Sequence, residues 1–215
     1  MKRLPIVGVM GSGSEEHREL AEPLGAWLAT QKVHLLNGGG AGVMTAVSRA
    51  FHGVPKRKGL VIGICPGQVG EAGYEATPGY PNPWIDIPIC THLPLRGTEG
   101  SDALSRNPIN ILSSDMIVAL PGSAGTASEV ALALCYRKPI IAWLRSRNDV
   151  PDLPAGVPVA RSLDEVKDFV TTTTTNLVGQ RPDRTSPSQA APVVGNHRGG
   201  RGLGFGPSQE AGSRE

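Results

Sequence analysis

Arg106 and Glu129 are the side chains whose types and spacing point most directly to chemistry. Glu129 follows a turn with the sequence PGSAGT at residues 121–126, and Arg106 stands fifteen positions before that turn begins. A carboxylate beside a sugar can stabilise a developing oxocarbenium ion or position a water, as in glycosidases. An arginine can hold a phosphate through charge-assisted hydrogen bonds. The pair therefore suggests either cleavage of a glycosidic bond or binding of an anionic ligand.

Two glycine-rich turns precede helical patterns and offer backbone amides to an anion. The first occupies residues 37–42, with four glycines in five positions, and the second is the PGSAGT turn. Free amides and the positive end of a helix dipole bind phosphate groups, and the hydroxyls of Ser123 and Thr126 would add to the second cradle. Close packing explains a single glycine equally well, and a capping box between Thr126 and Glu129 would start a helix without any ligand. We favour anion binding because neither alternative needs so many glycines.

Two common nucleotide-binding motifs are absent from the sequence, and so is a metal-binding pattern. A turn after the first apolar run begins Gly11-Ser12-Gly13, but Glu16 stands where the third glycine of a dinucleotide fingerprint belongs. No G-K-S or G-K-T follows any glycine turn, which excludes a P-loop. The histidines show no spacing suited to a shared metal ion, so we predict no metal site.

These residues need a scaffold in which strands and helices alternate. Apolar runs predict buried strands over residues 4–10, 33–36, 60–64, 85–89, 116–120 and 139–144. Helical spacing of apolar residues predicts helices over 14–31 (with Ser14 as N-cap), 43–51, 107–113, 127–136 and 163–170. The alternation predicts an α/β fold, a Rossmann-like doubly wound parallel sheet with helices on both faces. In such a sheet, ligands bind at the carboxyl ends of the strands, where the glycine turns lie.

A long segment rich in glycine and proline, residues 66–84, separates two of the predicted strands. Segments of this length are usually functional or mobile. It contains Tyr74, Tyr80 and Trp84, which would either stack on a flat ring of a ligand or pack the segment against the rest of the chain. The sequence leaves both alternatives open.

Composition limits the class of protein. The chain has 215 residues, of which 39% are hydrophobic, enough for one core, so we predict a single nucleotide-binding-type domain over residues 1–178. Residues 179–215 are rich in Gly, Pro, Ser and Arg, and we predict that they form a disordered tail. The formal net charge of +2 gives no general attraction for nucleic acid. A short RGG-like stretch at residues 198–202 does not change the expectation that nucleic acid is no partner.

Cysteine use and hydropathy indicate the compartment. Cys65, Cys90 and Cys135 are widely spaced and form no C-x-x-C pair, which favours a reducing compartment. Cys135 lies in an apolar helical pattern and is expected in the core. The first ten residues have the pattern of a strand and a turn rather than of a signal peptide, and no stretch reaches the roughly 18 apolar residues of a membrane span. We therefore expect a soluble, cytoplasmic protein with no membrane association.

In its glycine turns and around Arg106 the chain resembles the LOG family, once labelled lysine decarboxylase-like. Residues 121–129 are similar to the family motif P-G-G-x-G-T-x-x-E, and residues 39–44 are similar to its motif G-G-x-x-G-L-M. Arg106 stands at the spacing at which the family carries its active-site arginine, and the similarity spans about residues 4 to 145. Members of the phosphoribohydrolase type cleave the N-glycosidic bond of nucleoside 5′-monophosphates. The resemblance implies that Arg106 and Glu129 would carry out that reaction here.

Two departures from the motifs separate this chain from the phosphoribohydrolases. Ser123 replaces the second motif glycine, and Asn107 replaces the lysine that usually follows the arginine. Residues 105–115 and 124–134 are more similar to the branch that includes the molybdenum cofactor carrier proteins, which hold a pterin phosphate. The resemblance implies a small phosphorylated ligand, a homodimer or homotetramer, no required cofactor, and the molybdenum cofactor as cargo. We favour the carrier function and keep the phosphoribohydrolase as the alternative.

The residue pattern and the resemblance together define the candidate site. The predicted catalytic residues are Arg106 and Glu129. The predicted ligand-binding residues are Gly11, Ser12, Gly39, Gly40, Gly42, Met44, Arg106, Asn107, Gly122, Ser123, Gly125 and Thr126. Asp115, another carboxylate in this part of the chain, is expected at a strand start in a structural role. The prediction requires all the site residues to lie at one edge of the sheet.

Overall fold

Seven parallel strands form the main sheet of the computed structural model, which describes residues 3–179 of the chain. They are β1 (Ile6–Met10), β2 (His34–Asn37), β3 (Val61–Cys65), β6 (Ile87–Cys90), β7 (Met116–Ala119), β8 (Ile140–Trp143) and β9 (Val159–Ala160). Their order in the sheet is β6-β3-β2-β1-β7-β8-β9. Strands β1, β2 and β7 carry apolar side chains toward both faces, and both faces are covered. The predicted α/β fold with a doubly wound parallel sheet is confirmed.

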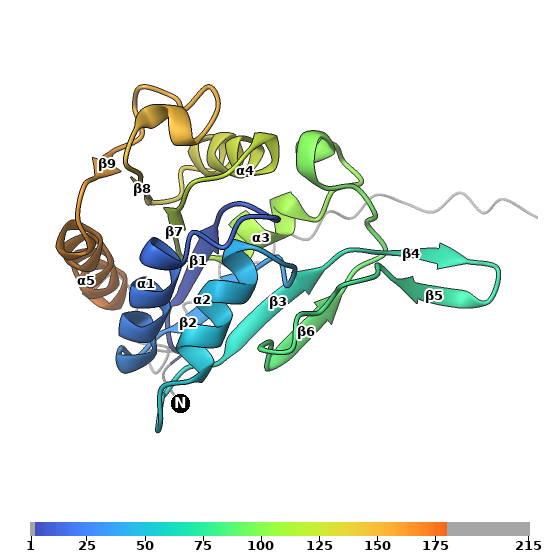
Figure 1. Cartoon of the computed structure of the whole chain (residues 1–215), viewed down its shortest axis with the longest axis horizontal. Coiled ribbons are helices and arrows are strands. Elements are labelled where there is room, and N and C mark those ends of the chain that lie inside the picture. The colour runs from blue at the N-terminus through green and yellow to red at the C-terminus, as the bar shows by residue number, and fades with distance from the viewer. Residues whose placement is uncertain (1–2, 180–215) are drawn as a thin grey trace, which may run out of the picture. The chain divides into compact units, whose positions relative to one another are not determined.

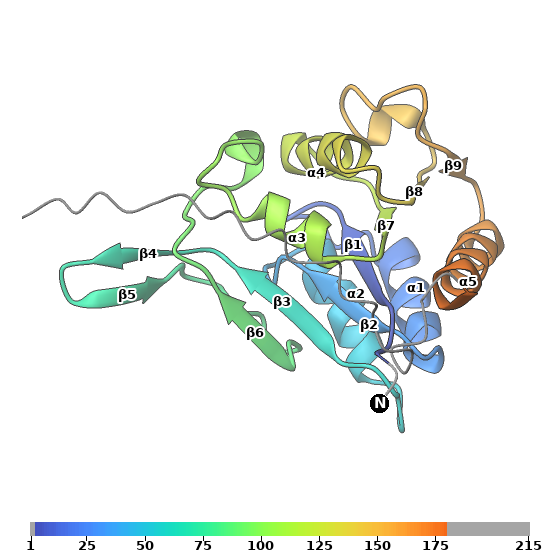
Figure 2. The same ribbon diagram turned by 180° about the vertical axis from the view of Figure 1, so that it is seen from behind.

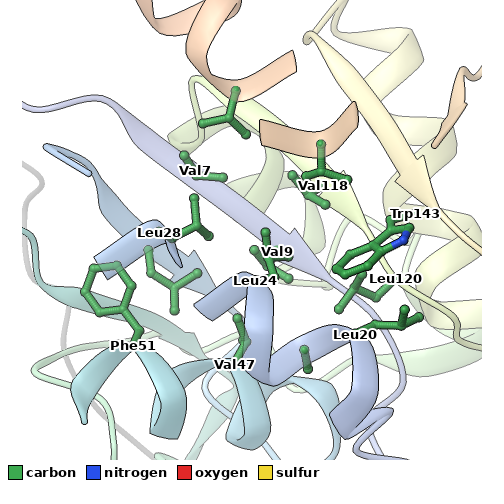
Figure 3. Close-up of a cluster of buried hydrophobic side chains, with 14 of the residues drawn as sticks. Val7, Val9, Leu20, Leu24, Leu28, Val47, Phe51, Val118, Leu120 and Trp143 are labelled. Carbon is green, nitrogen blue, oxygen red and sulfur yellow. The ribbon is translucent and has the colours of Figure 1, made fainter. Parts of the chain in front are cut away.

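Helices lie on both faces of this sheet (Figures 1 and 2). α1 (Arg18–Thr30), α2 (Val43–His52) and α5 (Leu163–Gly179) cover one face, and α3 (Asn107–Ser113) and α4 (Ala124–Cys135) cover the other. The leucines of α1 recur every fourth residue and so form one apolar stripe toward the sheet. Figure 3 shows this core, with Val7, Val9, Leu20, Leu24, Leu28, Val47, Phe51, Val118, Leu120 and Trp143 labelled. Each such buried side chain contributes about 1.5–3 kcal/mol, so the core holds the strand ends, and the turns after them, in place.

The direction of strand addition reverses between β1 and β7, which are neighbours in the sheet although far apart in sequence. At such a reversal the carboxyl ends of the strands border a crevice. Ser12, just after β1, links the adjoining turns: its amide donates to Pro121 O at 2.9 Å, and its carbonyl accepts from Val43 N at 2.9 Å. The turns after β1, β2 and β7 therefore lie side by side at one edge of the sheet.

α1 begins later than the sequence predicts. Its first residue is Arg18, and its N-cap is His17, with a φ of 41°, rather than Ser14. The hydroxyl of Ser12 accepts a hydrogen bond from the Glu15 amide at 2.9 Å. Because this bond holds the chain after β1 in a local turn, residues 14–17 stay outside the helix.

α4 begins earlier than predicted, at Ala124 rather than at residue 127. Thr126 and Glu129 are therefore both inside the helix, and the N-cap is Ser123, whose side chain makes no capping hydrogen bond. No capping box forms between Thr126 and Glu129. The explanation of the PGSAGT turn as a capping signal is wrong.

The glycine- and proline-rich segment 66–84 contains a hairpin that the sequence did not indicate. In it β4 (Gly67–Gly70) pairs antiparallel with β5 (Gly73–Ala76), and Figure 1 shows the hairpin extending away from the helices. β9 and the 3-10 turns η1 (Gly97–Glu99) and η2 (Arg147–Asp149) were also not predicted. β4 and β5 contain glycine and polar residues and β9 has only two residues, so none of them has the apolar run by which the other strands are predicted.

α5 continues to Gly179, beyond the predicted end at residue 170. The threonines at 171–175 have low helix propensity, but the helix is held by Val166 and Val170, which are buried against the sheet. The predicted domain boundary after residue 178 falls in the last turn of α5. Apart from Gly179, the predicted disordered tail lies outside the described residues.

Two further expectations concern hydropathy. None of the helices within residues 3–179 is long and apolar enough to cross a membrane.

Cys135 is exposed, so its predicted place in the core is wrong. It is the last residue of α4, where the helix leaves the sheet.

Candidate functional site

A cavity of about 440 Å³ opens at the carboxyl edge of the sheet, above the reversal of strand order. Backbone from the turns after β1 and β2 forms part of its wall. Its polar and aromatic side chains include Tyr80, Arg96, Arg106, Asn107, Ser123 and Glu129. Cavities of this size hold small molecules, and both predicted catalytic residues lie in it.

Arg106, the N-cap of α3, is the central cation of the cavity and is only 4% exposed. Its Nη1 donates to Asn107 Oδ1 at 3.1 Å, while its Nε has no hydrogen-bond partner within residues 3–179. The guanidinium occupies the space beside Gly38 where any larger residue would place its Cβ. A buried cation with an unpaired donor is unfavourable unless an acceptor reaches it. An anionic group in the cavity would supply that acceptor.

Glu129, from the second turn of α4, lies beside this cation at the cavity. The residue is 8% exposed; its Oε1 accepts from Asn110 Nδ2 at 3.1 Å and lies 4.0 Å from Arg106 Nη1. Burial raises the pKa of Glu129, and the opposing effects of Arg106 and Asn110 do not cancel it. The carboxyl therefore holds its proton at higher pH than an exposed glutamate does.

Helix α4 begins at the same cavity. The amides of Ala124, Gly125 and Thr126 have no hydrogen-bond acceptor within residues 3–179. First-turn amides point out of a helix along its axis and carry the positive end of its dipole. Ser123, the N-cap, is exposed and lines the cavity. This corner can bind an anion with backbone donors and one hydroxyl.

The glycine turn after β2 is occupied in part by the protein itself, while the amides of Ala41 and Gly42 have no acceptor within residues 3–179. The Gly39 amide donates to Asn37 Oδ1 at 2.8 Å, and the Gly40 amide lies 3.4 Å from Met44 Sδ. The Gly40 carbonyl accepts from Asn82 Nδ2 at 2.8 Å. Gly42 has a φ of 62°, and a Cβ there would collide with Ser12 O. These glycines allow close packing, which the sequence analysis had weighed as the alternative to anion binding.

Tyr80 and Arg96 also line the cavity, and Gly97, the residue after Arg96, packs against Gly125 in the first turn of α4. The Tyr80 ring packs against Gly40, where a Cβ would lie 2.7 Å from the ring. The guanidinium carbons of Arg96 and Arg106 lie 5.5 Å and 6.0 Å from the ring centroid, within the range of cation–π attraction. The sequence singled out Tyr80 only as one of three aromatics and did not indicate Arg96, an exposed residue in an irregular loop.

The other two aromatics of segment 66–84 do not line this cavity. Tyr74 lies on the hairpin strand β5, and Trp84 packs against His52 with ring centroids 5.6 Å apart. For Trp84 the packing alternative is therefore the observed one. Tyr80 alone of the three contributes to the cavity.

The structure divides the predicted ligand-binding residues into two groups. The residues that line the cavity are Gly11, Met44, Arg106, Asn107 and Ser123, together with the predicted catalytic Glu129. The others, Ser12, Gly39, Gly40, Gly42, Gly122, Gly125 and Thr126, are not among the lining residues and belong to the adjoining turns and to the first turn of α4. Ser12 illustrates the second group, because its hydroxyl accepts local amides and it lines a separate cavity of about 350 Å³.

Asp115 lies away from the cavity, just before β7. Its carboxylate accepts from the Ile6 amide at 2.8 Å and pairs with Arg3. This bond to β1 is structural, as expected. No group of three or more metal-ligating side chains occurs within the described part of the chain.

Known proteins are similar to this chain in sequence and fold. A sequence model of the SLOG cluster4 family matches residues 4–166. A molybdenum cofactor binding protein from the phototrophic bacterium Rippkaea orientalis has 32% identity and a TM-score of 0.60, covering 80% of this chain and 98% of that protein. The molybdenum cofactor carrier protein of Chlamydomonas reinhardtii has 30% identity and a TM-score of 0.57, covering 80% and 99%. An uncharacterized protein of Archaeoglobus fulgidus is 32% identical over 134 residues, 61% of this chain and 75% of that relative.

Proposed function

The chain belongs to the SLOG cluster4 family, and from this premise we propose that it binds a small phosphorylated ligand in the cavity at the β1/β7 reversal. We further propose that it acts as a carrier of a pterin phosphate, with the molybdenum cofactor as cargo. The proteins from R. orientalis and C. reinhardtii, described as binding or carrying that cofactor, support the choice of ligand.

One observation supports the proposal most: buried Arg106, whose Nε is unpaired within residues 3–179, lines a cavity at which an uncapped helix begins. Both features are unfavourable in an empty site, and one phosphate group would satisfy both. In this proposal the amides of residues 124–126 and the Ser123 hydroxyl hold the phosphate oxygens, and Arg106 neutralises their charge. Tyr80 and Arg96, which also line the cavity, contact the ring system.

Asn107 favours a carrier over an enzyme. It stands where phosphoribohydrolases have a lysine, and its Oδ1 accepts a hydrogen bond from Arg106. A neutral amide orients the arginine but brings no second charge to the reacting bond. Binding needs only the oriented cation, whereas cleavage of a glycosidic bond gains from charge aimed at the transition state.

The test is to purify the full-length chain from cells that make the cofactor and to assay copurified pterin by fluorescence after oxidation. We expect pterin near one equivalent per chain, and its loss in Arg106→Gln. Arg145→Gln, which removes an exposed arginine outside this cavity, is the matched control and should retain it. Absence of pterin in the parent chain, together with no binding of added pterin phosphate, would contradict the carrier proposal.

A second function, hydrolysis of nucleoside 5′-monophosphates, is supported by Glu129. A carboxyl group whose pKa is raised by burial can donate a proton to a leaving base, as a general acid. The assay is incubation with AMP and related monophosphates, followed by chromatography for free base. Base release that disappears in Glu129→Ala would favour the enzyme, and binding of AMP without release would favour a carrier or a nucleotide sensor.

We also propose that the chain forms a homodimer or homotetramer in the cytoplasm. The edge strand β6 lies clear of the helices in both views (Figures 1 and 2), and its Ile87 and Ile89 are 41% and 44% exposed. Parallel sheets are rarely left uncovered in this way, so a second copy would bury them. Light scattering of the parent chain and of Ile89→Lys tests this; equal monomeric masses would contradict it.

The unpaired cysteines favour the cytoplasm.

A further inference from the structure

Cys65 and Cys90 are paired across two neighbouring strands. They are the last residues of β3 and β6, and the parallel register sets them directly opposite each other. Paired residues of parallel strands point to the same face of the sheet, and the strands lie about 4.8 Å apart. That spacing lies within the Cα separations of about 4.4–6.8 Å that a disulfide spans. A disulfide between these residues needs only small adjustments at two strand ends.

Their surroundings differ in a way that suits a sensor. Cys90 is exposed, whereas Cys65 is buried. Burial, and after it the Cys90 thiolate, raises the pKa of Cys65 to about 11, while Arg106 lowers it in part. An oxidant in solution therefore reaches Cys90 first, and Cys65 is the partner that follows.

Cys65 also supports the glycine turn after β2. Its Sγ donates to Gly63 O at 3.6 Å and fills the space beside Gly39, where a Cβ would lie 2.8 Å from the sulfur. The next residue toward the strand, Gly38, is in contact with the Arg106 guanidinium. Movement of the Cys65 sulfur is thus transmitted within two residues to the central cation of the cavity.

We propose that Cys65 and Cys90 form a reversible disulfide that loosens the turn 38–42 and the seat of Arg106. The Cys90 thiolate attacks a hydroperoxide, ROOH, which gives a sulfenic acid and releases the alcohol ROH. The Cys65 thiol then attacks the Cys90 sulfur and loses its proton, the S–S bond forms, and the hydroxide of the sulfenic acid takes up that proton and leaves as water. Two thiols lose two electrons, and the peroxide gains two. A dithiol reverses the reaction by thiol–disulfide exchange.

The turn 38–42 loosens because the Cys65 sulfur has to move in order to reach Cys90. To bond with Cys90, the Cys65 Sγ turns from Gly63 O and leaves the space beside Gly39. That side of the turn then loses its packing contact, and a void against backbone destabilises the groups that lined it. The turn 38–42 should open more often, whether or not a ligand is bound.

The test uses the full-length chain treated with hydrogen peroxide or with dithiothreitol, then alkylated and mapped by peptide mass. Hydrogen exchange of the peptide that covers the turn is measured on both forms. We expect a linked pair of peptides containing Cys65 and Cys90, and exchange about tenfold faster in the oxidised form. Cys135→Ser, which removes the third cysteine, should behave like the parent chain. Cys90→Ser, a change at an exposed position, should abolish both effects.

Two outcomes would overturn the proposal. Oxidation that yields only chains linked through Cys135, or Cys90 oxidised beyond the sulfenic state with Cys65 free, would show that the pair does not close. A Cys65–Cys90 disulfide with unchanged exchange over the turn would show that it does not act on the cavity. Neither measurement depends on the identity of the ligand.

Discussion

The two glycine-containing corners of the cavity differ in what their backbone amides do. At the α2 corner, the amides of Gly39, Gly40 and Val43 are engaged by groups of the protein itself, whereas those of Ala41, Gly42, Met44 and Thr45 have no acceptor within the described residues. At the α4 corner, none of the first-turn amides of residues 124–126 has an acceptor within the described residues. The corner with more glycines thus engages part of its own backbone, and the α4 corner engages none of its first-turn amides.

This difference teaches that glycine content and ligand binding are separate properties of a strand–helix turn. The α2 glycines let Arg106, Tyr80 and Cys65 approach the backbone, so the turn positions the groups that meet the ligand. The α4 turn leaves donors free for the ligand itself. Substitutions at the first corner should therefore act on stability and geometry, and those at the second on binding.

The largest expected effect is on the stability of the α2 corner. Gly42→Ala places a Cβ against Ser12 O at a φ of 62°, and we expect a loss of about 3 kcal/mol in the free energy of unfolding. Gly156→Ala, at a position with open space around the new Cβ, is the matched control and should change it by less than about 0.5 kcal/mol. Urea denaturation measures both, and equal midpoints would show that the corner is not constrained.

The next largest effect is on anion affinity, and it distinguishes the buried Arg106 from the exposed Arg96. Arg106→Gln removes a charge-assisted donor from the cavity, and we expect AMP or inorganic phosphate to bind about 10- to 100-fold more weakly. Arg96→Gln should cost about threefold, because an exposed cation is screened by solvent. Titration calorimetry measures both variants. Equal losses would mean that the buried Arg106 contributes no more to anion binding than the exposed Arg96 does.

A smaller effect depends on pH. Above the raised pKa of Glu129 its carboxylate is charged and opposes an anion, whereas below that pKa it is neutral, as glutamine is. Glu129→Gln should therefore bind AMP about three- to tenfold more tightly than the parent chain at high pH. The ratio of the two affinities should approach one as pH falls. Taking the ratio cancels the titration of AMP itself, and a ratio that does not vary with pH would contradict the assignment.

The smallest effects compare two serines. Ser123→Ala removes an exposed hydroxyl at the α4 N-cap, and we expect phosphate affinity to fall by no more than about threefold with stability unchanged. Ser12→Ala removes the acceptor of the Glu15 amide and should lower the free energy of unfolding by about 1 kcal/mol with affinity unchanged. Calorimetry and urea denaturation on both variants check this. The reverse pattern would exchange the roles assigned to the two turns.

Much of the fold followed from the sequence because its strands are continuous apolar runs separated by glycine turns. The relation to the molybdenum cofactor carrier branch, inferred from the motifs around Arg106 and Glu129, is confirmed by the family and structure matches. Those two residues could be placed at the cavity because they stand near βα turns, and βα turns of a parallel sheet share one edge.

Other features could not be predicted, for physical reasons. Arg96 lies in an irregular loop and carries no periodic signal. The different roles of Gly42 and Gly125 depend on φ and on which atoms lie beside them, and neither is encoded in a count of glycines. The start of α1 differs from the prediction because the Ser12 hydroxyl accepts the Glu15 amide and so holds the chain after β1 in a local turn.

Ser12 has a consequence for how chains of this kind can diverge. Its amide, carbonyl and hydroxyl each engage a different partner, and those partners belong to the turns after β1 and β7 and to the start of α2. An insertion or deletion in any one of these turns would break the fit of the others. Changes in length should instead accumulate in the β4–β5 hairpin, which can grow or shrink without altering the cavity edge at Ser12.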